Sequence, residues 1–505
     1  MSGPSAVDSV IVDPAHVVPS HVDALLAQEL NQLSLLDRER AVEEIHGIHS
    51  LSDAEAVVQH EREALVQMQL EIGKIPFKPV YDEALRMRSQ YIHDPNFLLK
   101  FLRAEDLDAR KAAIRMMKFL THSARDLYGP RILMRPIRYM DLTPSAIALM
   151  REGNVTLLPS RDSSGRMVVA VLGDIDASIH ATDRLRMLFY FWQCITDDEQ
   201  TQKLGAVLVL NLAEMVHSAN DYEDKTVVIQ LLQSIPCKYS AVHFCFPPSP
   251  MFNAIKATFV LILGKKNRTR VRFHCGSPTE MLYSLKTFGI PVDHLPDNFG
   301  RSSKQTLKNH LRWCDMLQAR DNATNDGYDF EATPVVEYPR LEDCLFGKGR
   351  LIMKHPGNVG MRNILEREAH LWETATNQEK ARVARKVVSE IKKGGGRFLK
   401  EHPDGWYVEV DDETARQKVS IGFRDLMKRK RTREESEKRL RELQGAPQEE
   451  SAVSSQAQVL DSDTYGFLLN SSEQFAPKRR RLSSNDESTD DGANGCFCST
   501  PRVKG

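Results

Sequence analysis

Residues 235–263 read IPCKYSAVHFCFPPSPMFNAIKATFVLIL, and this stretch decides the expected fold. Its first half holds an apolar run of strand length at 241–246, which favours a buried β-strand. Residues 251–263 then place apolar side chains at helical spacing. Pro247 and Gly264 bracket this second run and are candidate hinge points. The stretch predicts a strand, a proline turn and an apolar helix in direct succession.

The expected helix at 251–263 is apolar on more than one side. One stripe at helical spacing consists of Phe252, Ile255, Phe259 and Ile262. A second set widens that stripe beyond one buried face: Val260, Leu261 and Leu263. Such a helix could close over an acyl chain and also touch a bilayer when open. The alternative is an ordinary helix buried in a protein core.

Three further apolar runs have the length of strands, at 167–172, 206–212 and 270–275. The first two are apolar at nearly every position, and helical patterns lie between the runs. Continuous apolar strands that alternate with helices indicate a sheet with helices on a face, an α/β arrangement.

Upstream of these runs the chain is expected to be helical. Residues 94–129 predict two short helices joined at Glu105–Asp108. The buried side chains expected on them are Phe97, Leu98, Phe101 and Leu102, then Ile114, Met117, Phe119 and Leu120. Leucine spacing predicts a helix over 19–50, and a capping-box pattern at Ser52 starts another that runs to Lys74. Residues 81–92 are a third candidate helix.

The stretch from Asp94 to Gly300 resembles the CRAL-TRIO family of lipid-binding and lipid-transfer proteins. The resemblance rests on an ordered series of segments: DPNFLLKFLRAEDLDARKAA from Asp94, DSSGRMVVAVLG around Gly165–Arg166, the quoted 235–259 run, and IPVDHLPDNFG. It implies a hydrophobic pocket with a sheet as its floor and a mobile helix as its gate. The family consists of ligand carriers, so the resemblance implies a binding protein and no enzyme.

The resemblance also implies where a ligand would sit. The expected lipid contacts are Val207, Val209, Phe252, Ile255, Phe259, Ile262 and Arg270. Arg270 stands where phosphoinositide-binding members carry a Lys, and it could pair with a phosphate. Cys237 follows Pro236, where those members place a Glu. The chain therefore departs from the phosphatidylinositol-binding pattern, and another phospholipid or an isoprenoid is an equally plausible ligand.

Residues 342–424 resemble a domain of unknown function that is common in diatom proteins. The matching motifs are HPGN at 355–358 and GGRFL at 395–399, together with Trp406. The pattern of residues 338–431 alone predicts a small α/β unit with helices at 360–373 and 377–392. From Leu341 to Arg431 there are 20 Lys and Arg against 14 Asp and Glu, an excess of +6. Residues 392–431, with Phe398 and Trp406 nearby, could contact nucleic-acid phosphates, or could be a solvated basic face.

The tail from 444 to 505 is rich in Ser, Asp, Gln, Gly and Asn, a composition that predicts disorder. Within it lies Lys478-Arg479-Arg480-Arg481, opened by Pro477. Four exposed cations in an extended chain are typical of a nuclear import signal, which an import receptor would bind. The alternative is a basic cluster that no receptor recognises, or one that contacts anionic lipid.

Global composition restricts the partners little, because 68 basic and 69 acidic residues leave a net charge of −1. The eight cysteines are scattered and form no metal-binding pattern, so no metal and no cofactor is expected. The N-terminus shows no secretory signal, and no apolar stretch approaches the ~20 residues that span a bilayer. We expect a cytoplasmic or nuclear protein whose membrane contact is peripheral.

These patterns divide the chain into successive regions. They are a disordered start at 1–18, a helical leader at 19–93, CRAL-TRIO N-terminal helices at 94–140, the lipid-binding domain at 141–302, a linker at 319–337, the small domain at 338–431 and the tail at 444–505. The favoured function is binding and transfer of a hydrophobic ligand. The alternatives are a nuclear regulatory or nucleic-acid-associated protein that acts through its C-terminal basic domain, and a GTPase-regulating scaffold that uses the CRAL-TRIO fold as a protein-docking module.

Overall fold

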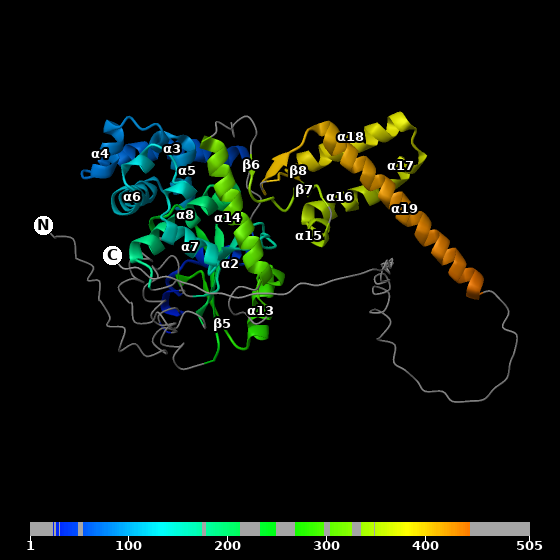
Figure 1. The fold of residues 1–505 in the computed structure, drawn as a ribbon, viewed down its shortest axis with the longest axis horizontal. Coiled ribbons are helices and arrows are strands. Elements are labelled where there is room, and N and C mark those ends of the chain that lie inside the picture. Colours follow the sequence, from blue (N-terminus) through cyan, green and yellow to red (C-terminus); the bar gives the residue numbers. More distant parts are fainter. Residues whose placement is uncertain are drawn as a thin grey trace, which may run out of the picture. The chain divides into compact units, whose positions relative to one another are not determined.

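A computed structural model of the chain gives the architecture (Figure 1). It describes residues 24, 27–29, 31–48, 54–173, 178–212, 233–248, 268–296, 304–325, 335–347, 349–403 and 405–444. Contacts group the chain up to Glu434 into one unit. The predicted helix at 251–263 and the basic run at 478–481 lie outside the described residues.

A five-stranded sheet forms the centre of the larger domain. Its strands lie in chain order, β1 (Val155–Leu157), β2 (Met167–Val171), β3 (Ala206–Asn211), β4 (Tyr239–Phe246) and β5 (Val271–Cys275). β1 pairs antiparallel with β2, and all the other pairs are parallel. The predicted α/β class is confirmed, and the four apolar runs are the four parallel strands.

Helices lie on both faces of this sheet. The connection from β2 to β3 contains α8 (Ala181–Thr196) and α9 (Glu199–Leu204), and β5 is followed by α13 (Pro278–Thr287). α7 (Pro144–Glu152) packs on α8, and α14 (Lys304–Asn325) packs on α7. Strands covered on both faces need apolar side chains at nearly every position, which explains their unbroken apolar pattern.

The N-terminal lobe is helical, as the sequence predicts. It contains α2 (Leu35–His46), α3 (Ala54–Lys74), α4 (Pro79–Arg86), α5 (Pro95–Ala104) and α6 (Ala109–Leu120). A single helix over 19–50 is wrong, because the Ser34 side chain accepts a hydrogen bond from the Asp37 N–H and starts α2 there. Ile114 is also wrong as a buried residue, since 43% of it is exposed. Ala112, Ala113 and Met116 fill that face of α6.

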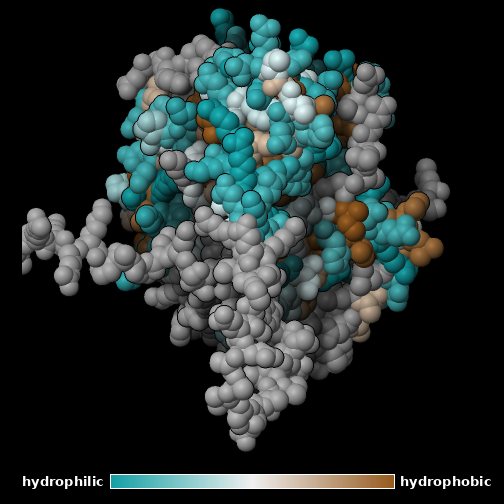
Figure 2. Space-filling model, turned by 90° about the vertical axis from the view of Figure 1, so that its right-hand side faces the viewer, coloured by the Kyte–Doolittle hydropathy of each residue, from teal (hydrophilic) through white to brown (hydrophobic). Residues whose placement is uncertain are grey.

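The smaller C-terminal domain is built on a second sheet. Its four strands lie in the order β6 (Val335–Val336), β9 (Tyr407–Glu409), β8 (Phe398–Glu401) and β7 (Cys344–Leu345). The helices are α15 (Arg350–Lys354), α16 (Pro356–Arg367), α17 (Ala369–Thr374), α18 (Asn377–Lys393) and α19 (Asp412–Gln444). The side of the molecule that carries this domain is mostly hydrophilic (Figure 2).

The linker expected at 319–337 is shorter in the structure. α14 continues to Asn325, and Val335 already belongs to β6. Composition misled the prediction because tertiary contacts hold this part of α14 in place: Asp321 accepts a hydrogen bond from the Tyr139 N–H. The two domains therefore follow one another with less intervening chain than the sequence indicates.

Candidate functional site

One face of the central sheet carries an apolar cluster made by strands. The buried members are Leu210, Leu212, Val242, Phe244, Phe246 and Val271, with Val171, Leu208, Tyr239 and Phe273 partly buried beside them. Side chains alternate along a strand, so these residues point to the same side. The Phe244 and Phe273 rings stack at 5.4 Å. Among the described residues, this cluster contains no helix side chain.

α8 lies along the same face, at the β2 side. Its residues share a core with Met167 and Val169 of β2 and with Ala206 of β3. At the border, the Trp192 ring meets the Tyr239 ring edge-on at 5.1 Å. In the described part of this face, α8 covers β2 and reaches Tyr239, while the apolar side chains farther along β4 and β5 gather in the cluster of strand residues.

The opposite face holds two of the predicted lipid contacts. Val207 and Val209 are fully buried there, in a core with Met281 and Leu285 of α13. Their neighbour Leu208 points to the strand-only cluster instead. A lipid contact of Val207 and Val209 on that cluster's side is therefore excluded by the alternation of the strand, and the prediction needs correction.

A group of histidines lies on this opposite face, on β4 and β5. His243 Nδ1 lies 2.9 Å from His274 Nε2, and the Phe288 ring lies against both imidazoles. The His46 ring of α2 stacks on the Phe288 ring, with 4.9 Å between the ring centroids. Burial lowers the pKa of His243 well below its usual value and lowers the pKa of His274 to about 4. Both rings are therefore neutral at physiological pH.

Arg270, the predicted phosphate ligand, is already paired inside the protein. Its Nε donates to Glu44 Oε2 at 2.6 Å, and only 8% of the residue is exposed. The other carboxylate oxygen of Glu44 lies 2.8 Å from Lys238 Nζ. The Glu44 carboxylate from α2 is thus the partner of the guanidinium that was expected to bind a ligand's phosphate.

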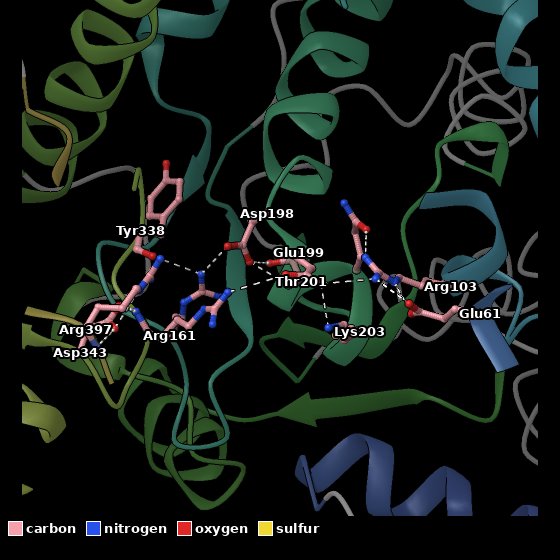
Figure 3. Close-up of polar contacts among 12 residues, drawn as sticks. Glu61, Arg103, Arg161, Asp198, Glu199, Thr201, Lys203, Tyr338, Asp343 and Arg397 are labelled. Atoms are coloured by element: carbon pink, nitrogen blue, oxygen red, sulfur yellow. Dashed lines mark hydrogen bonds and ion pairs between the residues drawn. The ribbon is translucent and has the colours of Figure 1, made fainter. Parts of the chain in front are cut away.

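A chain of polar contacts joins the two domains (Figure 3). Arg161, whose side chain is 3% exposed, lies at its centre and its Nη2 donates to Asp198 Oδ1 at 3.0 Å. Its Nε donates to the Pro339 carbonyl at 3.1 Å, so one guanidinium binds both α9's N-cap and the segment before β7. Beside it, Glu199 pairs with Lys203 at 2.8 Å. The hydrogen bond from Lys203 contributes most to lowering the pKa of Glu199.

A pocket of about 400 Å³ lies along this interdomain contact. Residues 197–199 line one side, residues 335–340 line another, and Arg320 and Arg397 complete it. Its charged groups are paired with one another: Arg320 with Glu337, and Arg340 with Glu199 at 3.9 Å. Arg397 pairs with Asp343 at 2.8 Å. Because its three arginines are each paired with an acid, this pocket presents no unpaired cation to an anionic ligand.

The motif residues of the C-terminal domain hold its turns together. Asp343 is fully buried and accepts hydrogen bonds from the backbone N–H and the guanidinium of Arg397. A Cβ at Gly357 would lie 2.2 Å from the Asp343 carbonyl oxygen, so only glycine fits there. The Asn358 amide donates to the Leu345 and Ile352 carbonyls. These motif residues have a structural role, and His355 starts α16.

Phe398 and Trp406, which lie near the predicted basic patch in sequence, are not on its surface. Phe398 is fully buried and Trp406 is 2% exposed, so neither ring can stack on a base. Lys392 is also engaged, with Asp412 at 2.7 Å. The cations between 424 and 431 are exposed, as are Lys393 and Lys400. Any contact of this region with phosphates would therefore depend on its cations and not on the two rings.

Several predicted residues lie outside the described part of the chain. They are Phe252, Ile255, Phe259, Ile262, Gly264 and the import residues Lys478, Arg479, Arg480 and Arg481. Pro247 is described and follows β4 directly. Within the described residues, no group of three or more His, Cys, Asp or Glu side chains could hold a metal ion. Within the same ranges, no helix is long and apolar enough to cross a membrane.

Comparison with known families agrees with this architecture. Residues 165–307 match the family model described as the divergent CRAL/TRIO domain. Residues 343–425 match the domain of unknown function DUF6824. No curated protein is similar enough to the chain to count as a relative. The chain thus combines a region of the divergent CRAL/TRIO type, which suggests a lipid or another small hydrophobic ligand, with a region of the DUF6824 type.

Proposed function

We propose that the protein binds one lipid-like molecule against the strand-only face of its central sheet, and that it carries or presents this ligand without catalysis. The observation that supports this most is the apolar cluster of β3, β4 and β5. Each methylene group moved from water into such surroundings contributes ~0.8 kcal/mol. An acyl or isoprenoid chain therefore needs few polar contacts to bind.

On this proposal the ligand contacts on β3 are Leu208 and Leu210, in place of Val207 and Val209. Phe244 and Phe246 of β4 and Phe273 of β5 would extend the same surface. Arg270 is left out, because its guanidinium faces Glu44. The choice of headgroup then depends on residues at the border of the face, of which the described part of the chain includes Tyr239 beside Trp192.

We further propose that residues 251–263 act as the gate of this site. They belong to the connection between β4 and β5, which are parallel neighbours in the sheet. Such connections are right-handed in almost all proteins. The preceding connection, from β2 to β3, carries α8 on the side of the strand-only face. The same handedness supports a place for 251–263 on that side, over the ligand, with Pro247 and Gly264 as hinges and contact with membranes when open.

Native mass spectrometry of the full chain tests the ligand proposal. The mass of the purified protein should exceed that of the chain by the mass of one lipid. Mass spectrometry of an organic extract then identifies this lipid. Leu208→Trp places bulk on the proposed face, and Leu282→Trp places the same bulk on the α13 side, where Leu282 is partly buried. Bound lipid should fall at least tenfold in the first variant only. Ligand-free protein that takes up nothing from mixed liposomes would refute the proposal.

A second candidate function concerns the C-terminal domain. We propose that it contacts nucleic acid, because α19 carries a run of exposed cations. Import through Lys478–Arg481 would bring the chain to the nucleus, where nucleic acid is available. This function is independent of the lipid site, and it is tested by binding of the full chain to labelled nucleic acid at increasing salt.

A further inference from the structure

α19 changes its surroundings near Met427. Up to that point the helix packs on its domain, since Ala415, Val419, Phe423 and Leu426 are buried. The Phe423 ring stacks on Trp372 at 4.3 Å. From Lys428 to Lys438 every side chain is exposed. The core of the domain thus fixes the first half of α19, and the second half offers its whole circumference to a partner.

The exposed part begins with a concentration of positive charge. Residues 424–433 read RDLMKRKRTR, six cations with the single acid Asp425. Among the described residues, Lys428–Arg431 make no ion pair. Some other cations of this domain are paired, as Lys386 is with Glu368 at 2.8 Å and Lys392 is with Asp412. Arg382, Lys393 and Lys400 are exposed at separate positions, whereas Lys428–Arg431 place four exposed cations in succession on one helical segment.

The order of these cations surrounds the helix with charge. Each residue of an α-helix is turned by about 100° from the one before, so the four consecutive cations of 428–431 point in four directions around the axis. Residues 428–439 contain no apolar side chain. A flat membrane surface would meet one side only, and an interfacial helix needs an apolar face, which this segment lacks. Anions on more than one side of the helix fit it better.

We propose that residues 424–433 of α19 dock in the major groove of duplex DNA. This inference rests on the second candidate function and names the partner and the element that binds it. A helix with its side chains is about 10–12 Å across, and the major groove of B-form DNA is about 12 Å wide. Phosphates line both walls of the groove, which matches cations on all sides of the helix. The deep, narrow major groove of duplex RNA does not admit a helix.

The binding is dominated by phosphate contacts and is therefore steeply dependent on salt. Each phosphate contact contributes about −0.9 to the slope of log K against log salt concentration. Removal of four contacting cations should make that slope less steep by about 3 to 4.

Fluorescence anisotropy on the full chain tests this inference, with a labelled 20-base-pair DNA duplex and an RNA duplex of the same sequence as probes. The test variant is Lys428→Gln/Arg429→Gln/Lys430→Gln/Arg431→Gln. The matched control removes four paired cations of the same domain, Arg367→Gln/Lys386→Gln/Lys392→Gln/Arg416→Gln. Both change the net charge equally, and the basic run at 478–481 is present in each. Circular dichroism checks that both are folded.

We expect the test variant to bind DNA at least 100-fold more weakly at 0.1 M NaCl, the control to change less than fivefold, and the RNA duplex to bind at least tenfold more weakly than DNA. Equal binding of both duplexes, or equal loss in both variants, would refute groove docking and leave contact with nucleic acid standing. Absence of binding to every nucleic acid would refute both. Binding to phosphatidylserine vesicles without DNA binding would refute groove docking and identify an anionic membrane as the partner of this segment.

Discussion

Glu44 of α2 and Arg270, directly before β5, form a buried ion pair across 226 residues of sequence. Arg270 Nε donates to Glu44 Oε2 at 2.6 Å, and Lys238 Nζ lies 2.8 Å from Glu44 Oε1. The pair attaches the N-terminal helix to the ends of two central strands. α2 is also held by Arg166, which is fully buried and whose Nη2 donates to the Ile45 carbonyl at 3.2 Å.

We therefore expect Glu44→Gln to destabilise the protein by about 3 kcal/mol. The substitution leaves the buried Arg270 guanidinium facing a neutral amide, and loss of one partner from a buried ion pair typically costs this much. Urea unfolding measures the difference. Glu43→Gln, on the exposed side of the same helix, is the control and should change stability by less than about 0.5 kcal/mol. Equal stability of both variants would show that α2 is not held by this carboxylate.

The histidine pair predicts loss of stability in acid. Burial holds the pKa of His274 at about 4, below its usual value of 6.5, and also lowers the pKa of His243 well below that usual value. Between pH 6.5 and 4 these two histidines bind protons in the unfolded chain but stay neutral in the folded protein. The free energy of unfolding therefore falls as the pH drops through this range. For His274 the difference corresponds to at most about 3 kcal/mol.

Unfolding of the wild type and of His274→Leu at a series of pH values measures this effect. The charged and titratable groups facing the pair are Arg272, Arg166 and His46. The variant should be less sensitive to pH between 6.5 and 4 than the wild type. Parallel pH profiles for the two proteins would mean that other groups cause the acid sensitivity.

The ligand site should show little preference for phosphatidylinositol. Cys237, in place of a Glu, is 3% exposed, and burial raises the pKa of its thiol to about 12, so it offers no negative charge to inositol hydroxyls. Arg270 is engaged by Glu44. In a competition between phosphatidylinositol and phosphatidylcholine liposomes, we expect less than threefold selectivity. Strong selectivity for phosphatidylinositol would contradict the reasoning from both residues.

The gate proposal predicts slower lipid exchange in Phe259→Asp. A charged side chain on the membrane-facing part of 251–263 would oppose entry into a bilayer. Transfer of a fluorescent lipid between vesicles should slow several-fold, while thermal stability changes little. Asn253→Asp, at a position of the same segment that is already polar, is the control. A large loss of stability with unchanged exchange would identify the segment as ordinary core.

The basic run at 478–481 predicts entry into the nucleus. A fluorescent fusion of the full chain should be enriched in nuclei, and Lys478→Ala/Arg479→Ala should disperse it. Lys428→Ala/Arg429→Ala removes two cations from α19 and should leave import unchanged. The import interpretation is wrong if the wild type and the tail variant are distributed alike.

The strands could be predicted because both of their faces are apolar. Such strands need apolar residues throughout, so the runs at 167–172 and 206–212 mark β2 and β3 to within one residue. The direction of each side chain was harder to predict. An unbroken apolar run carries no alternation, so the sequence did not distinguish Val207 and Val209, buried under α13, from Leu208 and Leu210 on the other side.

The polar contacts between distant segments could not be predicted from the sequence at all. Glu44 is one acid among many on a leader helix, and nothing local indicates its partner Arg270. The aromatic residues of the C-terminal domain show the same limit. Phe398 and Trp406 lie near cations in sequence, which suggested an exposed patch, but both rings pack into cores.

Trp406 determines how the chain can be divided. It belongs to the C-terminal sheet's hairpin, yet its side chain is buried in one core with Met316 and Leu317 of α14. Arg161 likewise depends on the Pro339 carbonyl. A gene fusion or truncation that separated the two regions would expose an indole on one fragment and leave a guanidinium without its acceptor on the other. Exchange of either region between proteins during evolution would therefore require compensating substitutions where the two regions contact each other.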